Sequence, residues 1–211
     1  ERLLIANTTS LRMKKCEPEQ WAVYECWLRG MDLLRKTSQE NVVESRTYFE
    51  RAIAIDPSYA RAYAGLAMSW YEAWNNLCWV SWWKLGDKAL GYALKALELD
   101  DEDHHIHCIL GVVSLHTRDF DRARHHLDKA ERINPNDART LANASLAWGG
   151  LGEPERAVKM AEMAIRLDPF HPDWYLAALG TTYYIAKDYE RAIATLEVAP
   201  DGLCDTRLFL A

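Results

Sequence analysis

The chain has 211 residues, of which 49% are hydrophobic and 11% aromatic, and its formal net charge is −6. This apolar content is sufficient for a sizeable buried core. The acidic balance, without a block of lysine or arginine, argues against a nucleic-acid partner, and without an apolar run of roughly 20 residues we expect no membrane span.

The five cysteines, Cys16, Cys26, Cys78, Cys108 and Cys204, are odd in number and widely spaced. No Cys-x-x-Cys pair is present, and this usage is typical of a reducing compartment, so we expect a cytoplasmic protein. Because the sequence begins with Glu1 and shows no signal peptide, we also expect it to be part of a longer protein.

Residues 1–20 combine a short apolar run with a basic patch, and we expect them to be an N-terminal extension or the end of a preceding domain. From residue 21 to residue 35, apolar side chains recur mostly at steps of three and four, which predicts a helix. A second predicted helix follows the polar stretch KTSQEN and ends at Asp56-Pro57. Together the two helices form a first predicted hairpin, residues 21–57.

The second predicted hairpin, residues 58–101, differs from the others by an insertion of about ten residues between its helices. The insertion lies within NNLCWVSWWKLG and contains Trp79, Trp82 and Trp83. Aromatic side chains favour burial. We therefore expect these tryptophans either to pack over their own hairpin or to form a surface through which copies of the chain associate.

Residues 104–135 and 138–169 align without a gap. Matching small, bulky and proline positions recur 34 residues apart, at Gly111, Ala123, Leu127, Ala130 and Pro135 and again at Ser145, Ala157, Ala161, Ala164 and Pro169. Such a period indicates stacked helical hairpins, because one amphipathic hairpin cannot bury its apolar face alone. Residues 172–204 continue the pattern with a shift of one residue, and residues 205–211 look like the start of a sixth, truncated unit.

This pattern resembles the tetratricopeptide repeat family, and the resemblance covers nearly the whole chain from about Trp21. It implies an all-α fold in which tandem helix-turn-helix units form a right-handed α-solenoid superhelix. The repeats are expected at residues 21–57, 58–101, 104–135, 138–169 and 172–204.

In that family, set positions of each first helix face the concave surface. Carried over to this sequence, the resemblance implies a partner-binding groove that is mostly apolar and aromatic, lined by Trp27, Met31, Arg61, Met68, Tyr71, His105, Ile109, Arg139, Asn143, Leu146, Trp174 and Tyr184. This composition suits a protein or peptide segment that docks through its apolar side. Alternatively, the same residues bury the chain's own N-terminal extension or the tryptophan insertion.

The resemblance does not extend to the groove chemistry of chaperone adaptors. Members that bind the C-terminal carboxylates of heat-shock chaperones carry lysine, asparagine and arginine at set groove positions. Repeat one here has Trp27 and Met31 at the first two of these positions, and repeat two has Gly65 at the next. We therefore do not expect a chaperone adaptor.

Six of the seven histidines fall in the third repeat. His104 and His107 are three residues apart and could share a helix face, as a zinc or nickel site would require. No cysteine pair joins them and no closed ligand set is evident, so we expect no metal and no other cofactor. The sequence also lacks a nucleophile elbow, a phosphate-binding glycine loop and a dinucleotide fingerprint, which predicts a non-catalytic chain.

A closer resemblance rests on the stretches YECWLRG, YFERAIAIDPSYARAYAGLA and LDPFHPDWYLAALGTTYYIAKDYERAI. They are similar to the repeat region that follows class III adenylate or guanylate cyclase domains in bacterial proteins. The resemblance implies an interaction scaffold that regulates a larger signalling protein. Two alternatives stay open: a module for homodimerisation, and a sensor for a small molecule or a metal.

Overall fold

The computed structural model describes residues 18–36, 38–77 and 82–199, with side chains except at residues 18, 74–77 and 82–84. All regular structure in these ranges is helical, so the predicted all-α fold is confirmed. The helices are α2 (Pro18–Arg35), α3 (Gln39–Ile55), α4 (Ala60–Leu77), α5 (Trp82–Leu99), α6 (His104–His116), α7 (Phe120–Ile133), α8 (Ala138–Gly150), α9 (Pro154–Leu167), α10 (Trp174–Ile185) and α11 (Tyr189–Leu196). No helix among the described residues is long and apolar enough to cross a bilayer.

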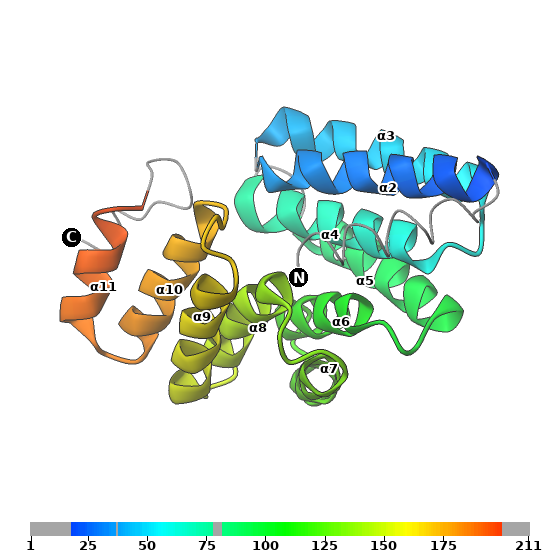
Figure 1. The fold of residues 1–211 in the computed structure, drawn as a ribbon. Coiled ribbons are helices and arrows are strands. Elements are labelled where there is room, and N and C mark those ends of the chain that lie inside the picture. The colour runs from blue at the N-terminus through cyan, green and yellow to red at the C-terminus, as the bar shows by residue number, and fades with distance from the viewer. Residues whose placement is uncertain (1–17, 37, 78–81, 200–211) are drawn as a thin grey trace.

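The helices pair in chain order into hairpins, and the hairpins stack into one curved array from α2–α3 to α10–α11 (Figure 1). The first helices of successive hairpins, α2, α4, α6, α8 and α10, contact one another and form an inner layer. The second helices pack against this layer. In an array of this kind the inner helices share one continuous surface, and the predicted partner-binding groove lies on that surface.

Several of the helices have an aspartate as their N-cap residue. The carboxylates of Asp103, Asp119, Asp137 and Asp188 accept hydrogen bonds from backbone N–H groups in the first turns of α6, α7, α8 and α11. These N–H groups have no partner within the helix, so an aspartate at this position stabilises each helix start. Asp103 and Asp137 are 34 residues apart, so the cap recurs with the repeat.

The first two hairpins depart in detail from the sequence expectation. Helix α2 begins at Pro18 rather than at Trp21, since proline fits the first turn of a helix. Helix α3 begins at Gln39, where Ser38 caps it by accepting from the N–H of Asn41. Helices α4 and α5 each have 18 residues, against 13 and 14 in α6 and α7. The insertion therefore adds mainly helix length.

Close contacts between helices explain the small residues of the repeat. Phe49 of α3 is fully buried between Gly30 of α2 and Gly65 of α4. A Cβ atom would lie 2.5 Å from the Phe49 ring at Gly30 and 2.4 Å from it at Gly65. No side chain fits at either position unless the ring moves, so glycine sets how closely these helices approach.

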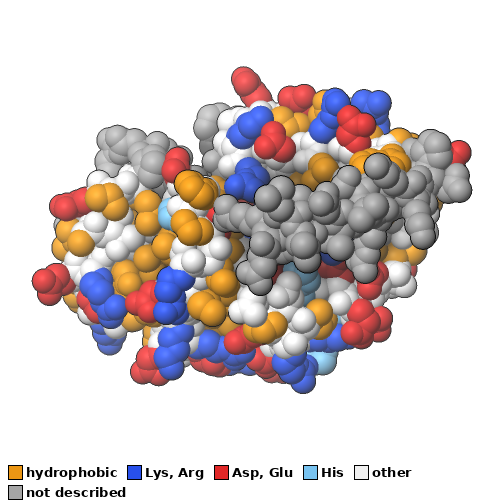
Figure 2. Space-filling model, viewed as in Figure 1, with side chains coloured by type: hydrophobic (Ala, Val, Ile, Leu, Met, Phe, Trp, Pro, Cys, Tyr) orange, Lys and Arg blue, Asp and Glu red, His pale blue; other side chains and the backbone are white. Residues whose placement is uncertain are grey.

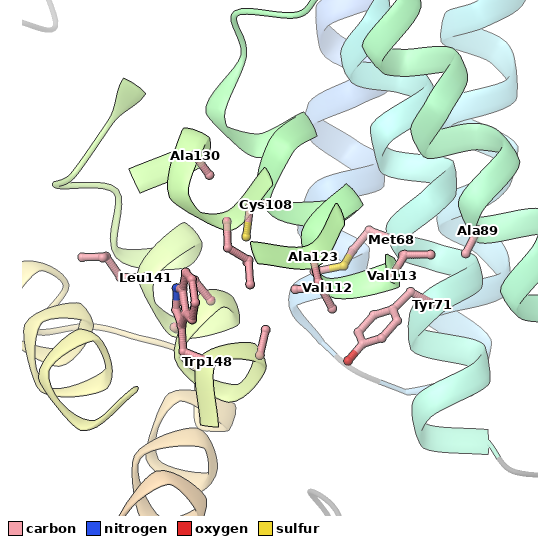
Figure 3. Packing of buried hydrophobic residues seen from close by; sticks show 14 of the residues in the cluster. Met68, Tyr71, Ala89, Cys108, Val112, Val113, Ala123, Ala130, Leu141 and Trp148 are labelled. Atoms are coloured by element: carbon pink, nitrogen blue, oxygen red, sulfur yellow. The ribbon is translucent and has the colours of Figure 1, made fainter. Parts of the chain in front are cut away.

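One continuous hydrophobic core runs through most of the array (Figure 3). Met68 and Tyr71 of α4 meet Val112 and Val113 of α6, and the core continues to the buried Trp148 of α8. Because each hairpin buries its apolar face against its neighbours, the repeats stabilise one another.

Candidate functional site

The inner layer contains a concave pocket at the junction of α2, α4, α6 and α8. It is open to solvent and is lined by Trp27, Met31, Arg61, Ala64, Gly65, Met68, His105, Cys108, Ile109, Arg139, Thr140 and Asn143. The lining is largely apolar. Four separate helices contribute to it, so the pocket depends on the stacking of four repeats.

Eight of the twelve predicted groove residues meet in this pocket: Trp27, Met31, Arg61, Met68, His105, Ile109, Arg139 and Asn143. Their spacing explains why. Trp27 and Met31, His105 and Ile109, and Arg139 and Asn143 are each four residues apart, so each pair lies on one face of its helix.

The other four predicted residues lie elsewhere. Trp174 lines a second pocket. Tyr71 is buried in the core with its ring edge-on to His116, and Tyr184 is 41% exposed and contacts Tyr189. Leu146 is half-buried on α8. Their part in binding stays a prediction.

The polar side chains of the pocket are held in place at its α4–α6 side. The Arg61 guanidinium donates to the Asp103 carboxylate at 2.6 Å, and it lies 5.5 Å from the centre of the Trp27 ring. Burial by itself would raise the pKa of Asp103, but the hydrogen bond and charge of Arg61 outweigh burial and hold that pKa below its usual value. Burial lowers the pKa of His105 to about 4, so its ring is neutral at physiological pH.

The second pocket was missed by sequence reasoning. Its lining residues come from the end of α2, the start of α8 and the α9–α10 corner: Arg35, Asp137, Ala138, Arg139, Asp168, Pro172, Trp174 and Tyr175. Figure 1 shows that the array curves until the end of α2 faces this corner. Arg139 lines both pockets and joins them into one groove, and burial lowers the pKa of its guanidinium.

The outer layer has a different surface. Charged side chains gather along the lower edge of the molecule in Figure 2, where α7 and α9 lie. There Arg156 of α9 donates to Asp128 of α7 at 2.7 Å and also to Glu131, and its guanidinium lies 3.7 Å from the centre of the Trp148 ring. These groups satisfy one another, which distinguishes this face from the apolar groove.

The histidines of the third repeat separate into two arrangements. His107 is buried, with one ring nitrogen 2.8 Å from the Asp101 carbonyl oxygen and the other 2.8 Å from Nδ1 of His126. With both nitrogens engaged, His107 cannot join His104 in a metal site as the sequence suggested. His104 and His105 instead lie beside Asp137, and ligand atoms of these three residues lie within 4.8 Å of one another. Asp137 is not among the ligands predicted from the sequence.

The predictions for the tryptophan insertion and for the N-terminal segment concern residues or side chains that the structure does not describe. Trp79 and the N-terminal segment 1–17 are not among the described residues. Trp82 and Trp83 lie in the first turn of α5, and their side chains are likewise outside the description. The expectations that these residues pack over their own hairpin, fill the groove or join two copies stay predictions.

The sequence of the chain matches the model of the tetratricopeptide repeat at residues 86–138 and 142–203. The chain belongs to the tetratricopeptide repeat family. Its groove is therefore the inner surface of a tetratricopeptide repeat array, and repeat proteins of this kind mediate protein–protein interactions.

Relatives and solved structures agree with this assignment. The chain is 28% identical over 162 residues to Superkiller protein 3 of Schizosaccharomyces pombe, a match covering 74% of this chain and 11% of that protein. It is 33% identical over 78 residues to the Hsp70-Hsp90 organizing protein of Triticum aestivum, which covers 37% of this chain and 13% of that protein. The matches thus span about an eighth or less of these relatives.

A solved tetratricopeptide repeat protein of Thermus thermophilus has the same fold. Its TM-score against this chain is 0.65 at 21% identity, and the match covers 90% of this chain and 95% of that one. At this level of identity the likeness shows the repeat architecture and leaves the ligand to be argued from the groove.

Proposed function

We propose that this chain is a non-catalytic scaffold that binds a protein or peptide segment in the groove formed by its first helices. The observation that carries the proposal is the pocket itself. Residues from four repeats meet in one concave, mainly apolar surface, and Trp27, Met31 and Ile109 are only partly covered by the core. A partner's apolar side chains would remove this surface from water.

Arg139 indicates that the partner segment carries a negatively charged group. Arg139 lines both pockets, and burial lowers the pKa of its guanidinium. Acidic groups, Glu72 first, act on it through their charge, yet among the described residues no carboxylate forms an ion pair with it. We therefore propose a partner segment with apolar side chains and one carboxylate, which would approach Arg139.

The test is selection of binding peptides from a phage-displayed library on the immobilised chain, followed by fluorescence anisotropy with the selected peptides. Met31→Lys and Arg139→Ala should each weaken binding by about tenfold or more, because each removes one feature of the groove. The matched control is Lys159→Ala on the outer helix α9, which lies away from the groove and should leave the dissociation constant unchanged. Failure to select any peptide, or equal binding by all variants, would contradict the proposal.

Light scattering on the same samples addresses the alternative of homodimerisation. A concentration-dependent dimer that is lost on Trp82→Ala and Trp83→Ala substitution would assign the chain to self-association. A monomer throughout the concentration range would leave the groove as the functional surface.

We further propose that the scaffold is the regulatory region of a larger bacterial signalling protein, such as an adenylate cyclase, in the cytoplasm. Support for the parent comes from the stretches around Trp27, Phe49 and Trp174 that are similar to cyclase-associated repeats. Support for a reducing compartment comes from Cys26 and Cys108, which are free and buried. Removing this region from the parent should change its rate of cyclic nucleotide formation, and a parent without cyclase activity would contradict the assignment.

A further inference from the structure

Three side chains with metal-binding atoms converge where the third repeat meets the fourth. His104 and His105 are the first two residues of α6, and Asp137 is the residue immediately before α8. Asp137 stands one period after Asp103, so the stacking of two equivalent helix starts brings its carboxylate to the histidines of the preceding repeat. The site is therefore built by two repeats together.

The distances between these groups are too long for hydrogen bonds. Nε2 of His104 lies 3.8 Å from Oδ2 of Asp137, and Nδ1 of His105 lies 3.9 Å from Oδ1 of the same carboxylate. The two imidazole rings are 4.0 Å apart between their centres. The three groups thus face one another without bonding to one another. Nε2 of His104 and Nδ1 of His105 make only long contacts of 3.4 Å, with Asn134 and Thr140 respectively, whereas the Nδ1 atoms of His107 and His126 are 2.8 Å apart.

This spacing suits a metal ion. One ligand atom from each of the three residues lies within 4.8 Å of the other two. A point centred among three such atoms lies at most about 2.8 Å from each, whereas zinc binds imidazole nitrogen and carboxylate oxygen at about 2.0 to 2.2 Å. Side-chain shifts of about half an ångström would complete the ligand set. Two imidazoles and one carboxylate also form a donor set that zinc and its neighbours in the transition series accept, while magnesium and calcium prefer oxygen ligands alone.

The surroundings fix the ligands and supply negative charge. The Asp137 carboxylate accepts from the N–H of Thr140 at 2.7 Å, and the Asp103 carboxylate accepts from the N–H of His105 at 2.8 Å. These bonds hold both helix starts in place. The neighbouring cation Arg61 is paired with Asp103 at 2.6 Å, and the acidic run Asp100–Asp103 adjoins the site.

We propose that His104, His105 and Asp137 bind one divalent transition-metal ion of the zinc type, with a fourth position open to water. The site is separate from the recognition of a peptide by the apolar groove, although His105 borders both. The sequence expectation of no metal considered His104 with His107 and did not include Asp137.

The experiment is titration of the purified chain with zinc chloride in a calorimeter, with magnesium chloride as a second titrant. We expect one zinc ion per chain, a rise in melting temperature with zinc, and no heat with magnesium. Cobalt(II) should give visible absorption bands of a site with nitrogen and oxygen ligands.

Two variants locate the ion. Asp137→Asn removes the charge, yet asparagine can still cap α8, so the fold is retained. His104→Gln removes one imidazole at a partly exposed position. Each should weaken zinc binding by at least about tenfold and abolish the cobalt bands, with the metal-free melting temperature little changed. His125→Gln, at an exposed histidine on α7, is the matched control and should bind zinc like the unaltered chain.

Two outcomes would overturn the proposal. The first is a chain that shows neither heat nor a melting shift with zinc. The second is zinc binding that Asp137→Asn and His104→Gln leave intact, which would show that other histidines bind the ion.

Discussion

The interior of the hairpins and their concave face use the same residue types in opposite ways. Within the α6–α7 hairpin, the His107 ring lies 2.8 Å from Nδ1 of His126 through one nitrogen and 2.8 Å from the Asp101 carbonyl oxygen through the other. On the concave side of the same helix, His104 and His105 face Asp137 at nearly 4 Å without hydrogen bonds to it. The side chains differ only in position, so the neighbours decide whether a histidine holds the fold together or remains able to bind a ligand.

The tautomers of the interior pair follow from its partners. A carbonyl oxygen only accepts, so Nε2–H of His107 donates to Asp101. Nδ1 of a neutral His107 then accepts, and His126 donates its Nδ1–H. Both rings are neutral, because burial, aided by nearby positive charges, lowers the pKa of each. Removal of either ring would leave the other with a buried, unpaired nitrogen.

The largest expected effect is therefore on the interior pair. His107→Ala should lower the free energy of unfolding by about 3 kcal/mol, because it creates a cavity and leaves Nδ1 of His126 unpaired. Urea denaturation measures the loss. His125→Ala, at the exposed neighbour of His126, should change stability by less than about 0.5 kcal/mol. Equal losses for the two variants would contradict the contrast between interior and surface histidines.

A substitution at Gly65, which contacts Phe49, tests the packing of the interior without changing any polar group. Gly65→Ala places a Cβ where the Phe49 ring lies and should cost about 2 kcal/mol. Gly91→Ala in α5 is the matched control, since no described residue outside the local helix backbone has an atom within 4 Å of the added Cβ. There the change should stabilise the helix by about 0.5 to 1 kcal/mol. Thermal or urea unfolding would reveal the opposite signs.

The interior pair also predicts a dependence of stability on pH. The pKa of His126 is about 4 in the folded chain, against 6.5 for an unperturbed histidine, because of burial and of the nearby His107, His125, Arg122 and Lys129. As pH falls from 6.5 to 4, the unfolded chain takes up a proton that the folded chain does not.

This histidine's contribution is therefore complete above pH 6.5 and lost progressively down to about pH 4, by about 2 to 3 kcal/mol. Urea midpoints at about pH 7.5 and about pH 4.5 measure the loss, together with the contributions of other groups that titrate in this range. In His126→Gln the pH dependence between these values should be weaker, and an unchanged dependence would rule out His126 as a source.

The smallest expected effect on stability is on the concave face. Arg139→Met keeps the aliphatic stem and removes a half-buried charge that no described carboxylate pairs with. Stability should stay within about 0.5 kcal/mol of the original or rise slightly, in contrast to the interior variants. A loss as large as that of His107→Ala would show that the guanidinium serves the fold rather than a partner.

Features of the repeat that depend on one helix or one hairpin could be predicted from the sequence. Gly30 and Gly111 stand at the small position of the repeat, and each meets a bulky side chain, Phe49 and Leu127 respectively, as the pattern implies. The groove residues of α2, α4 and α6 were predicted from the resemblance to the family, in which set positions lie on one face of each first helix. Local periodicity suffices for such features, since each depends on a single helix or a single hairpin.

The sequence by itself determined the repeat, its helices and the face that each first helix presents, because these follow from side-chain spacing, capping residues and a 34-residue period. Only the tertiary structure brought Arg35 of the first repeat to Tyr175 of the fifth, and His104 and His105 to Asp137. The physical reason is that curvature and inter-repeat contacts depend on how whole hairpins pack, and small rotations per repeat add up along the array.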